Sequence, residues 1–426
     1  MYRQAIVLPL GLCVCALAAL PQTSSAPDQF VAIAVAHNRE LLALNQRVAQ
    51  ARGLLKQANV GPPDNIEVSG LAGQPVGNRG EDSIAITYAH TFETFGKRNK
   101  RVTVAERQLA LAQAEFDEHR RALALEVKQR FVDAASEQQK LETLDRLLAV
   151  NRDYLRLTEA RVEKGDAARL EAELLRVELD RDQARRMLTA GRVLDSKLQL
   201  KALLDTPANE MLTFDASLTP PSFVDDLSRL QSLAGANRPD LIALRIEEQQ
   251  SASQTALAKV ETKPNITLAG QYFHADSSFS QYGLTAMGAL TPIRDHDEMV
   301  GIGVSIPLTG ARRNRGNIEA SVARELELRL RRQYLESAIP IQVEAAYQRW
   351  RAARDAVAVF SGAVIGQSEK NLAVMRQAYQ LGELRLLDIL NEQRRLLDTE
   401  LSYIDAQADL FRSYAELENA VGGSLL

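Results

Sequence analysis

Histidine, cysteine and paired carboxylates are the residue types through which this chain could bind metals or catalyse reactions. The 426-residue chain has five histidines and two cysteines, and no H-x-x-x-H or H-E-x-x-H zinc motif. No Ser-His-Asp set, glycine-rich phosphate loop or paired-carboxylate site stands out. The sequence therefore predicts no catalytic residue, no metal site and no cofactor, and the protein is not expected to be an enzyme. The histidines are His37, His90, His119, His274 and His296.

One segment, residues 275–299, concentrates potential metal ligands and is expected to be a loop. It contains Asp276, Asp295, His296, Asp297, Glu298 and Met299. Two hypotheses stay open: a loop that attracts metal cations weakly, or an ordinary solvated polar loop. We favour the solvated loop.

The N-terminus is typical of an export signal. Arg3 precedes an apolar stretch over residues 5–20, and small residues follow it. The stretch is shorter than the about 20 residues that a membrane-spanning helix needs. Both cysteines, Cys13 and Cys15, lie in this stretch, and Leu12 is too large for a good lipid-attachment motif before Cys13. No cysteine remains in the rest of the chain for a disulfide or a thiolate site.

The mature sequence contains an internal repeat. Residues 65–70 match residues 265–270, and 96–101 match 310–315. A period of roughly 200 residues is too long for a solenoid and indicates a duplicated unit. Each half is predicted to be a helix, two short strands, a very long helix, a turn and a long helix. The predicted units are a signal peptide (1–26), a first repeat (27–205), a connection (206–226) and a second repeat (227–426).

Composition indicates long helices. Aromatic residues make up 5% of the chain, and the net charge is only -4 without a basic patch, so nucleic acid is not an expected partner. Residues 28–58 are predicted to form one helix. Residues 98–163 lack proline, and such a helix would be about 100 Å long, which requires a coiled coil or a tube of helices. The second long run, 317–381, contains Pro340, a predicted kink.

The strands alternate strictly. In 83–92 and 300–308 the even positions are apolar and the odd positions are small or polar. A half-buried sheet would show this pattern, and so would a membrane strand with lipid on one face and a water-filled lumen on the other. Aromatic residues near the expected strand ends favour the membrane strand. Four strands cannot enclose a lumen, so several chains would have to close the barrel. These aromatic residues are Phe92, Phe95, Tyr272, Phe273, Phe279 and Tyr282.

The run from Tyr379 to Asn391 resembles the Y-x-x-G-x-x-x-x-x-D-[VI]-L segment of the TolC family of trimeric outer-membrane channels. The segments 95–101 and 307–318 resemble the G-K-R-x-x-R and P-L…R-N-x-G-x-I motifs of its CzcC-like branch, which pairs with heavy-metal exporters of the resistance-nodulation-division (RND) type. The resemblance implies a mainly α fold with a small β part. Duplicated helical hairpins would form an α-barrel tube, and a homotrimer would close a 12-stranded β-barrel in outer-membrane lipid.

The resemblance also implies a passive duct that reaches into the periplasm, where an adaptor protein joins it to an inner-membrane RND pump. The hairpin tips, within 164–168 and 381–385, would then dock the adaptor. A simpler reading is that the two glycines only permit left-handed turns at helix ends. The predicted docking residues are Lys164, Gly165, Asp166, Leu381, Gly382 and Glu383.

A constriction is implied near the same tips. The family narrows its tube with a ring of aspartates, of which Asp388 matches the first position, while Asn391 replaces the second. Three crowded copies of Asp388 would favour cations and raise one another's pKa. Tyr379 matches a residue that holds the closed state in the family. The family's neighbouring arginine falls on Leu384, with Arg385 next to it, so that network is not carried over intact. Asp388 could also be one solvated charge among many.

The sequence therefore predicts an outer-membrane duct for tripartite efflux of divalent heavy-metal cations of the cobalt, zinc and cadmium type. Alternatives are a duct for drugs and dyes, a type I secretion duct, and an exported coiled-coil scaffold without a pore. The apolar strand stripes argue against the scaffold.

Overall fold

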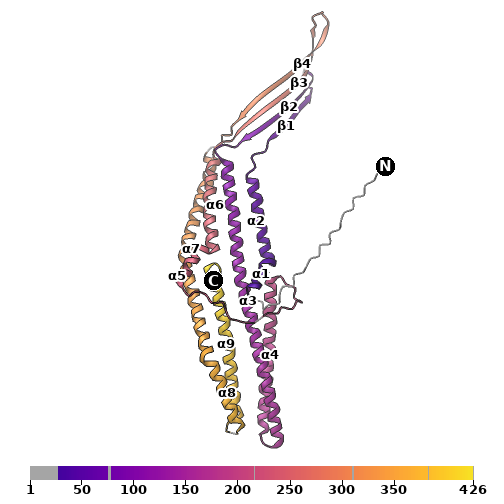
Figure 1. Ribbon diagram of the computed structural model, residues 1–426. Coiled ribbons are helices and arrows are strands. Elements are labelled where there is room, and N and C mark those ends of the chain that lie inside the picture. The colour runs from indigo at the N-terminus through magenta and orange to yellow at the C-terminus, as the bar shows by residue number, and fades with distance from the viewer. Residues whose placement is uncertain (1–26, 75–77, 215, 309–310, 382, 426) are drawn as a thin grey trace, which may run out of the picture.

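A computed structural model describes residues 27–74, 78–214, 216–308, 311–381 and 383–425. The chain is long and narrow, with a sheet at one end and the tips of two helical hairpins at the other (Figure 1). The predicted signal peptide, with Cys13 and Cys15, lies outside the described residues, as does Gly382.

Each repeat begins with two helices. For the first repeat the sequence predicted a single helix over residues 28–58. Asn38 interrupts the first pair with extended backbone angles (φ -60°, ψ 119°), and its side chain accepts the N–H of Leu41 at 3.0 Å. Asparagine favours such a cap over a helix interior, which explains the break. Arg238 (φ -62°, ψ 119°) makes the same break just before Pro239. The helices are α1 (Pro27–His37), α2 (Arg39–Ala58), α5 (Leu227–Asn237) and α6 (Pro239–Glu261).

The first long hairpin confirms the predicted uninterrupted helix. α3 (Lys97–Lys164) has 68 residues, which corresponds to about 100 Å. It ends at Gly165, whose φ of 79° is a left-handed conformation that glycine adopts without strain. The chain then returns along α4 (Arg169–Leu204).

The second long hairpin is interrupted. α7 (Ala311–Val359) runs through Pro340, where the sequence predicted a kink. The change in helical hydrogen bonding comes later, in the π-helical segment η1 (Phe360–Val364), before α8 (Ile365–Gln380). The chain then returns along α9 (Leu386–Val421).

Four antiparallel strands form one sheet in the order β1-β2-β3-β4, so strands of the two repeats pair directly through β2 and β3. The predicted loop over residues 275–299 is wrong, because both strands of a hairpin run through it and only residues 285–289 form the turn. Its aspartate, glycine and proline residues are depleted in ordinary strands, which concealed the hairpin. The strands are β1 (Asn65–Gly73), β2 (Asn78–Phe92), β3 (Ile266–Leu284) and β4 (Leu290–Ser305).

One face of this sheet is an exposed apolar stripe. The register aligns Val68, Ile86, Tyr272 and Val300 in one row across the four strands. In the single chain Val300 is 83% exposed and Ile302 is 84% exposed. Tyr272 and Phe273 lie inside β3 and not at its end, contrary to the sequence prediction. No helix among the described residues is long and apolar enough to cross a membrane.

The helices share narrow cores at mid-length. Phe30, Phe131 and Phe411 pack where α1, α3 and α9 meet, and Trp350 and Tyr414 pack where α7 and α9 meet. The connection between the repeats supplies Leu218 to the first core and Phe223 to the edge of the second. The connection therefore ties both repeats into one unit.

Candidate functional site

The two hairpin tips lie together at the end opposite the sheet (Figure 1). At the first tip Lys164, Gly165 and Asp166 are exposed, and the N–H of Asp166 donates to the carbonyl of Arg161 at 2.9 Å. At the second, the N–H of Glu383 makes the same bond to the carbonyl of Ala378 at 2.9 Å, and Leu381 and Glu383 are exposed. Both tips are thus closed by a bond of the Schellman type that leaves their side chains free for contact.

A small apolar cluster joins the hairpins just behind the tips. Leu175 of α4 is buried against Leu386 and Leu390 of α9. Tyr154 and Leu155 of α3 and Tyr379 of α8 surround it.

Tyr379 makes a specific link between the hairpins. Its hydroxyl donates to Glu171 Oε2 of α4 at 3.1 Å, and the guanidinium of Arg161 lies 5.4 Å from its ring centroid. Burial raises the pKa of Tyr379, and the charge of Glu171 adds to this, so the phenol stays a neutral donor at physiological pH. The sequence identified Tyr379 but missed Glu171. A signal existed, because Leu170-Glu171 is the repeat counterpart of Leu387-Asp388.

Asp388 and Asn391 are exposed on the first turns of α9, and Asp388 caps its own helix. Asp388 Oδ2 accepts the backbone N–H of Arg385 at 3.3 Å. A carboxylate in the first helical turn also interacts favourably with the helix dipole. Arg385 is exposed and takes part through its backbone. Within one chain, then, the structure pairs Tyr379 with Glu171 but pairs Asp388 only with its own helix end, as far as the described residues show.

Further links continue along α4 at seven-residue intervals, which places them on one helix face. Glu178 binds Arg394 of α9, with Nε and Oε1 2.7 Å apart, and Arg185 lies 3.6 Å from Asp398 of α9. We call these two pairs and the Tyr379–Glu171 bond the inter-hairpin ladder. Glu178 is only 6% exposed, and its hydrogen bond to Arg394 lowers its pKa despite burial.

A second buried carboxylate adjoins the ladder. Asp182 accepts the side-chain N–H of Asn151 at 2.9 Å. Burial and the charge of Glu178 raise the pKa of Asp182. Both acids interact with Arg394, and its loss would leave Glu178 buried without its hydrogen-bonded cation. Sequence reasoning missed this group because its members lie on three helices.

The motif behind the branch resemblance has a structural role. Lys97 is buried at the start of α3, where its ammonium donates to Asn265 Oδ1 at 2.7 Å and to the carbonyl of Lys263. Arg101 pairs with Glu93 through the two terminal nitrogens of its guanidinium. These residues fix the sheet to the helices, and Lys97 joins the two repeats.

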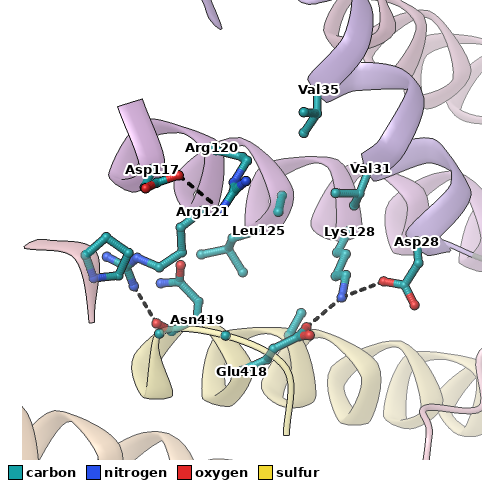
Figure 2. Close-up of a pocket in the computed structure, with 15 residues that line it drawn as sticks. Asp28, Val31, Val35, Asp117, Arg120, Arg121, Leu125, Lys128, Glu418 and Asn419 are labelled. Carbon is teal, nitrogen blue, oxygen red and sulfur yellow. Dashed lines mark hydrogen bonds and ion pairs between the residues drawn. The ribbon is translucent and has the colours of Figure 1, made fainter. Parts of the chain in front are cut away.

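A cavity of about 290 Å³ lies at mid-length between α1, α3 and α9 (Figure 2). Lys128 crosses it to Asp28 at 2.8 Å and Glu418 at 2.6 Å, and so ties the first helix to the last. Burial opposes the charge of Lys128, but the two hydrogen bonds outweigh it and raise its pKa. The polar groups drawn around the cavity are largely engaged with one another, which indicates a structural brace.

Comparison with known proteins agrees with this architecture. The family described as "Outer membrane efflux protein" matches residues 31–206 and 230–423. The cobalt-zinc-cadmium resistance protein CzcC of Cupriavidus metallidurans is 22% identical, with 98% of this chain and 99% of the relative covered. The outer membrane protein TolC of Vibrio cholerae is 23% identical over 75% of this chain and 72% of its own.

A solved structure of CusC, described in connection with transmembrane channel formation, shares the fold with a TM-score of 0.71. It is 17% identical, with 93% of this chain and 92% of that chain covered. The resemblance drawn from the sequence motifs is thereby confirmed, as is the mainly helical fold with a small sheet. The chain belongs to the outer membrane efflux protein family, which is a family of channels and not of enzymes.

Proposed function

We propose that this outer-membrane efflux channel is a homotrimeric passive duct for divalent heavy-metal cations, in the cobalt, zinc and cadmium class. An inner-membrane RND pump would supply the energy, and a periplasmic adaptor would join pump and duct. The full-length similarity to a cobalt-zinc-cadmium resistance protein carries the choice of cargo.

The sheet supports the membrane end of the duct. From Ile84 to Phe92 the even residues of β2 form a mainly apolar band that is interrupted only by His90, and these nine residues span about 27 Å along a strand. That length suits the about 25 Å apolar belt of outer-membrane barrels, whose strands are tilted. β1 and β4 each have one unpaired edge in the single chain. Open edges are not stable in lipid, so three copies would pair edge to edge into a twelve-stranded barrel.

The hairpin tips support the periplasmic end. Lys164, Gly165 and Asp166 at one tip and Leu381 and Glu383 at the other offer exposed groups for adaptor docking. The remaining predicted docking residue, Gly382, belongs to the same tip in sequence. Three exposed copies of Asp388 around one axis would form a cation-selective constriction, with Asn391 one turn further along. Tyr379 and its ladder would hold this end closed.

Growth of a deletion strain tests the cargo. Cobalt, zinc, cadmium, nickel, copper and silver salts would be titrated beside dyes and detergents, with the wild-type gene restored on a plasmid as control. Sensitivity restricted to some of the metals supports the proposal. Sensitivity to dyes and detergents alone assigns the duct to drug efflux.

Assembly is tested separately by fractionation and sizing. A trimer-sized species in mild detergent, recovered from the outer membrane, supports the duct. Recovery as a water-soluble monomer would favour the scaffold without a pore.

A further inference from the structure

The β3–β4 hairpin brings together two histidines and two carboxylates that are separated in sequence. The register pairs His274 with Glu298 and Asp276 with His296, and these two pairs follow one another on the same face of the sheet. Even-numbered residues of both strands share one face, so all four side chains lie on the same side of the sheet.

The contacts within this cluster are close. His296 Nδ1 lies 2.7 Å from Asp276 Oδ1, and His274 Nε2 lies 3.3 Å from Asp276 Oδ2. His296 Nε2 lies 3.6 Å from Glu298 Oε1. The two imidazole rings meet edge to face with centroids 4.7 Å apart.

We propose that His274, His296 and Glu298 form a surface site for one divalent transition-metal ion, with Asp276 as a positioning residue. One ligand atom from each of the three lies within 4.8 Å of the others. Bonds of about 2.1 Å in a tetrahedral site require ligand atoms about 3.4 Å apart. His296 and Glu298 are exposed and His274 is partly exposed, so rotation of these side chains would close that difference, and water would complete the coordination.

The donor set determines the class of metal. Two imidazoles and one carboxylate suit Zn²⁺, Cu²⁺, Ni²⁺ and Co²⁺ and do not suit Mg²⁺ or Ca²⁺, which prefer oxygen ligands alone. Asp276 bonded to Nδ1 of His296 fixes the ring so that Nε2, on the side of Glu298, carries the free lone pair. This is the carboxylate–histidine–metal arrangement common in metalloproteins.

The cluster lies at the border of the apolar stripe. Ile84 shares a row with His274, and the next row holds Asp82, Asp276 and His296. If the stripe faces lipid, as the proposed function requires, the site lies on the outer wall just beyond the membrane and not in the duct. Bound metal would brace β3 to β4 where the sheet leaves the lipid. Metal binding at these side chains depends only on their geometry and not on the orientation of the sheet in the membrane.

The test titrates the purified full-length protein in detergent, without a polyhistidine tag, with Zn²⁺ by calorimetry and with Cu²⁺ by electron paramagnetic resonance. We expect one ion per chain and hyperfine splitting from two nitrogen ligands. The His274→Ala/His296→Ala double variant should bind about 100-fold more weakly or not at all. The matched control is His90→Ala. His90 lies on β2 and its Nδ1 is 2.5 Å from Asp64 Oδ1, but this histidine–carboxylate pair includes no second imidazole.

Asp276 has its own readout. Asp276→Ala should weaken binding by about 10-fold while the two-nitrogen signal is kept, and Asp276→Asn should recover part of the loss. Wild-type binding no tighter than that of the double variant, or an equal loss in His90→Ala, would overturn the site.

The growth assay separates this proposal from the proposed cargo. The double variant should restore metal resistance fully, because its residues face away from the lumen. A loss of resistance would contradict the placement outside the duct, whereas a deletion strain that tolerates all metals would count against the cargo and leave the titration result standing.

Discussion

The two hairpin tips arise from the same duplicated sequence but use their equivalent carboxylates differently. Glu171 and Asp388 both occupy the third position of a helix that follows a glycine turn. Glu171 accepts a bond from the other hairpin, whereas Asp388 caps its own helix and is exposed. The cause lies one turn before the glycine, where the second repeat has Tyr379 and the first has Val162. One aromatic hydroxyl thus commits one acid to holding the hairpins together and leaves its counterpart available to the proposed constriction.

The long helices of the two repeats also differ in regularity. α3 is a continuous α-helix, whereas its counterpart passes through the π-helical segment η1. π-helical turns often mark functional positions in helices. The second hairpin therefore carries both the tyrosine of the ladder and the local irregularity, which makes it the half that we expect to move when the duct opens.

The largest effect is expected from Arg394→Ala, which removes the cation between the hairpins. Glu178 would stay buried without its partner, at a cost of about 3 kcal/mol in unfolding free energy. Thermal unfolding in detergent measures this loss of unfolding free energy. The matched control is Arg395→Ala, the adjacent exposed residue, which should cost less than about 0.5 kcal/mol. If the two variants lost equal unfolding free energy, the inter-hairpin ladder would not be a source of stability.

The pH dependence sharpens this result. The pKa of Glu178 is lowered from 4.5 in the folded chain, so its pairing contributes stability above pH 4.5 and loses it as pH falls through the folded value. Without Arg394, burial would instead raise the pKa of Glu178, so the gap in melting temperature between wild type and Arg394→Ala should be constant at neutral pH and narrow progressively as pH falls into the acid range. A gap that stays the same down to strongly acidic pH would show that charge pairing is not its origin.

A smaller effect is expected from Tyr379→Phe, which removes only the hydroxyl that reaches Glu171. The lost bond to a charged acceptor is worth about 1.4 kcal/mol, or a tenfold change in the ratio of open to closed channels. Single-channel recordings in planar bilayers measure the open fraction. Tyr403→Phe, an aromatic hydroxyl on α9 outside the ladder, is the control and should leave the open fraction unchanged.

The smallest effect is expected from Asp388→Ala, which should increase single-channel current or relieve block by divalent cations by about twofold. Asp388→Asn is the companion variant, because an amide oxygen can still cap α9 while the charge is lost. The two variants should behave alike if charge matters. Unchanged current and unchanged block in both would exclude Asp388 from the constriction.

Helix lengths and strand faces could be predicted from the sequence because each depends on local residue types. The absence of proline from 98 to 163 was sufficient for α3, and strict alternation over 83–92 identified the C-terminal part of β2, which begins earlier, at Asn78. The break at Asn38 was missed, since asparagine is tolerated in helices as well as at caps. The partner of Tyr379 could not be predicted, because Glu171 is 208 positions away and nothing local selects it. Asp276, His296 and Glu298 were identified as potential metal ligands in a loop, but the place of His274 beside them was missed because it depends on the register of a hairpin that the polar residues concealed.

The order of the strands has a consequence for how a proposed ring of copies is built. Because β2 pairs with β3 inside the chain, the two free edges belong to different repeats, β1 at one side and β4 at the other. Each contact between copies is then head to tail, and such contacts give closed rings only when the rotation per copy is a whole fraction of a turn. One or two copies would expose both edges and the apolar stripe, so an incomplete ring is the form most prone to aggregate. Biogenesis would therefore have to couple ring closure to membrane insertion.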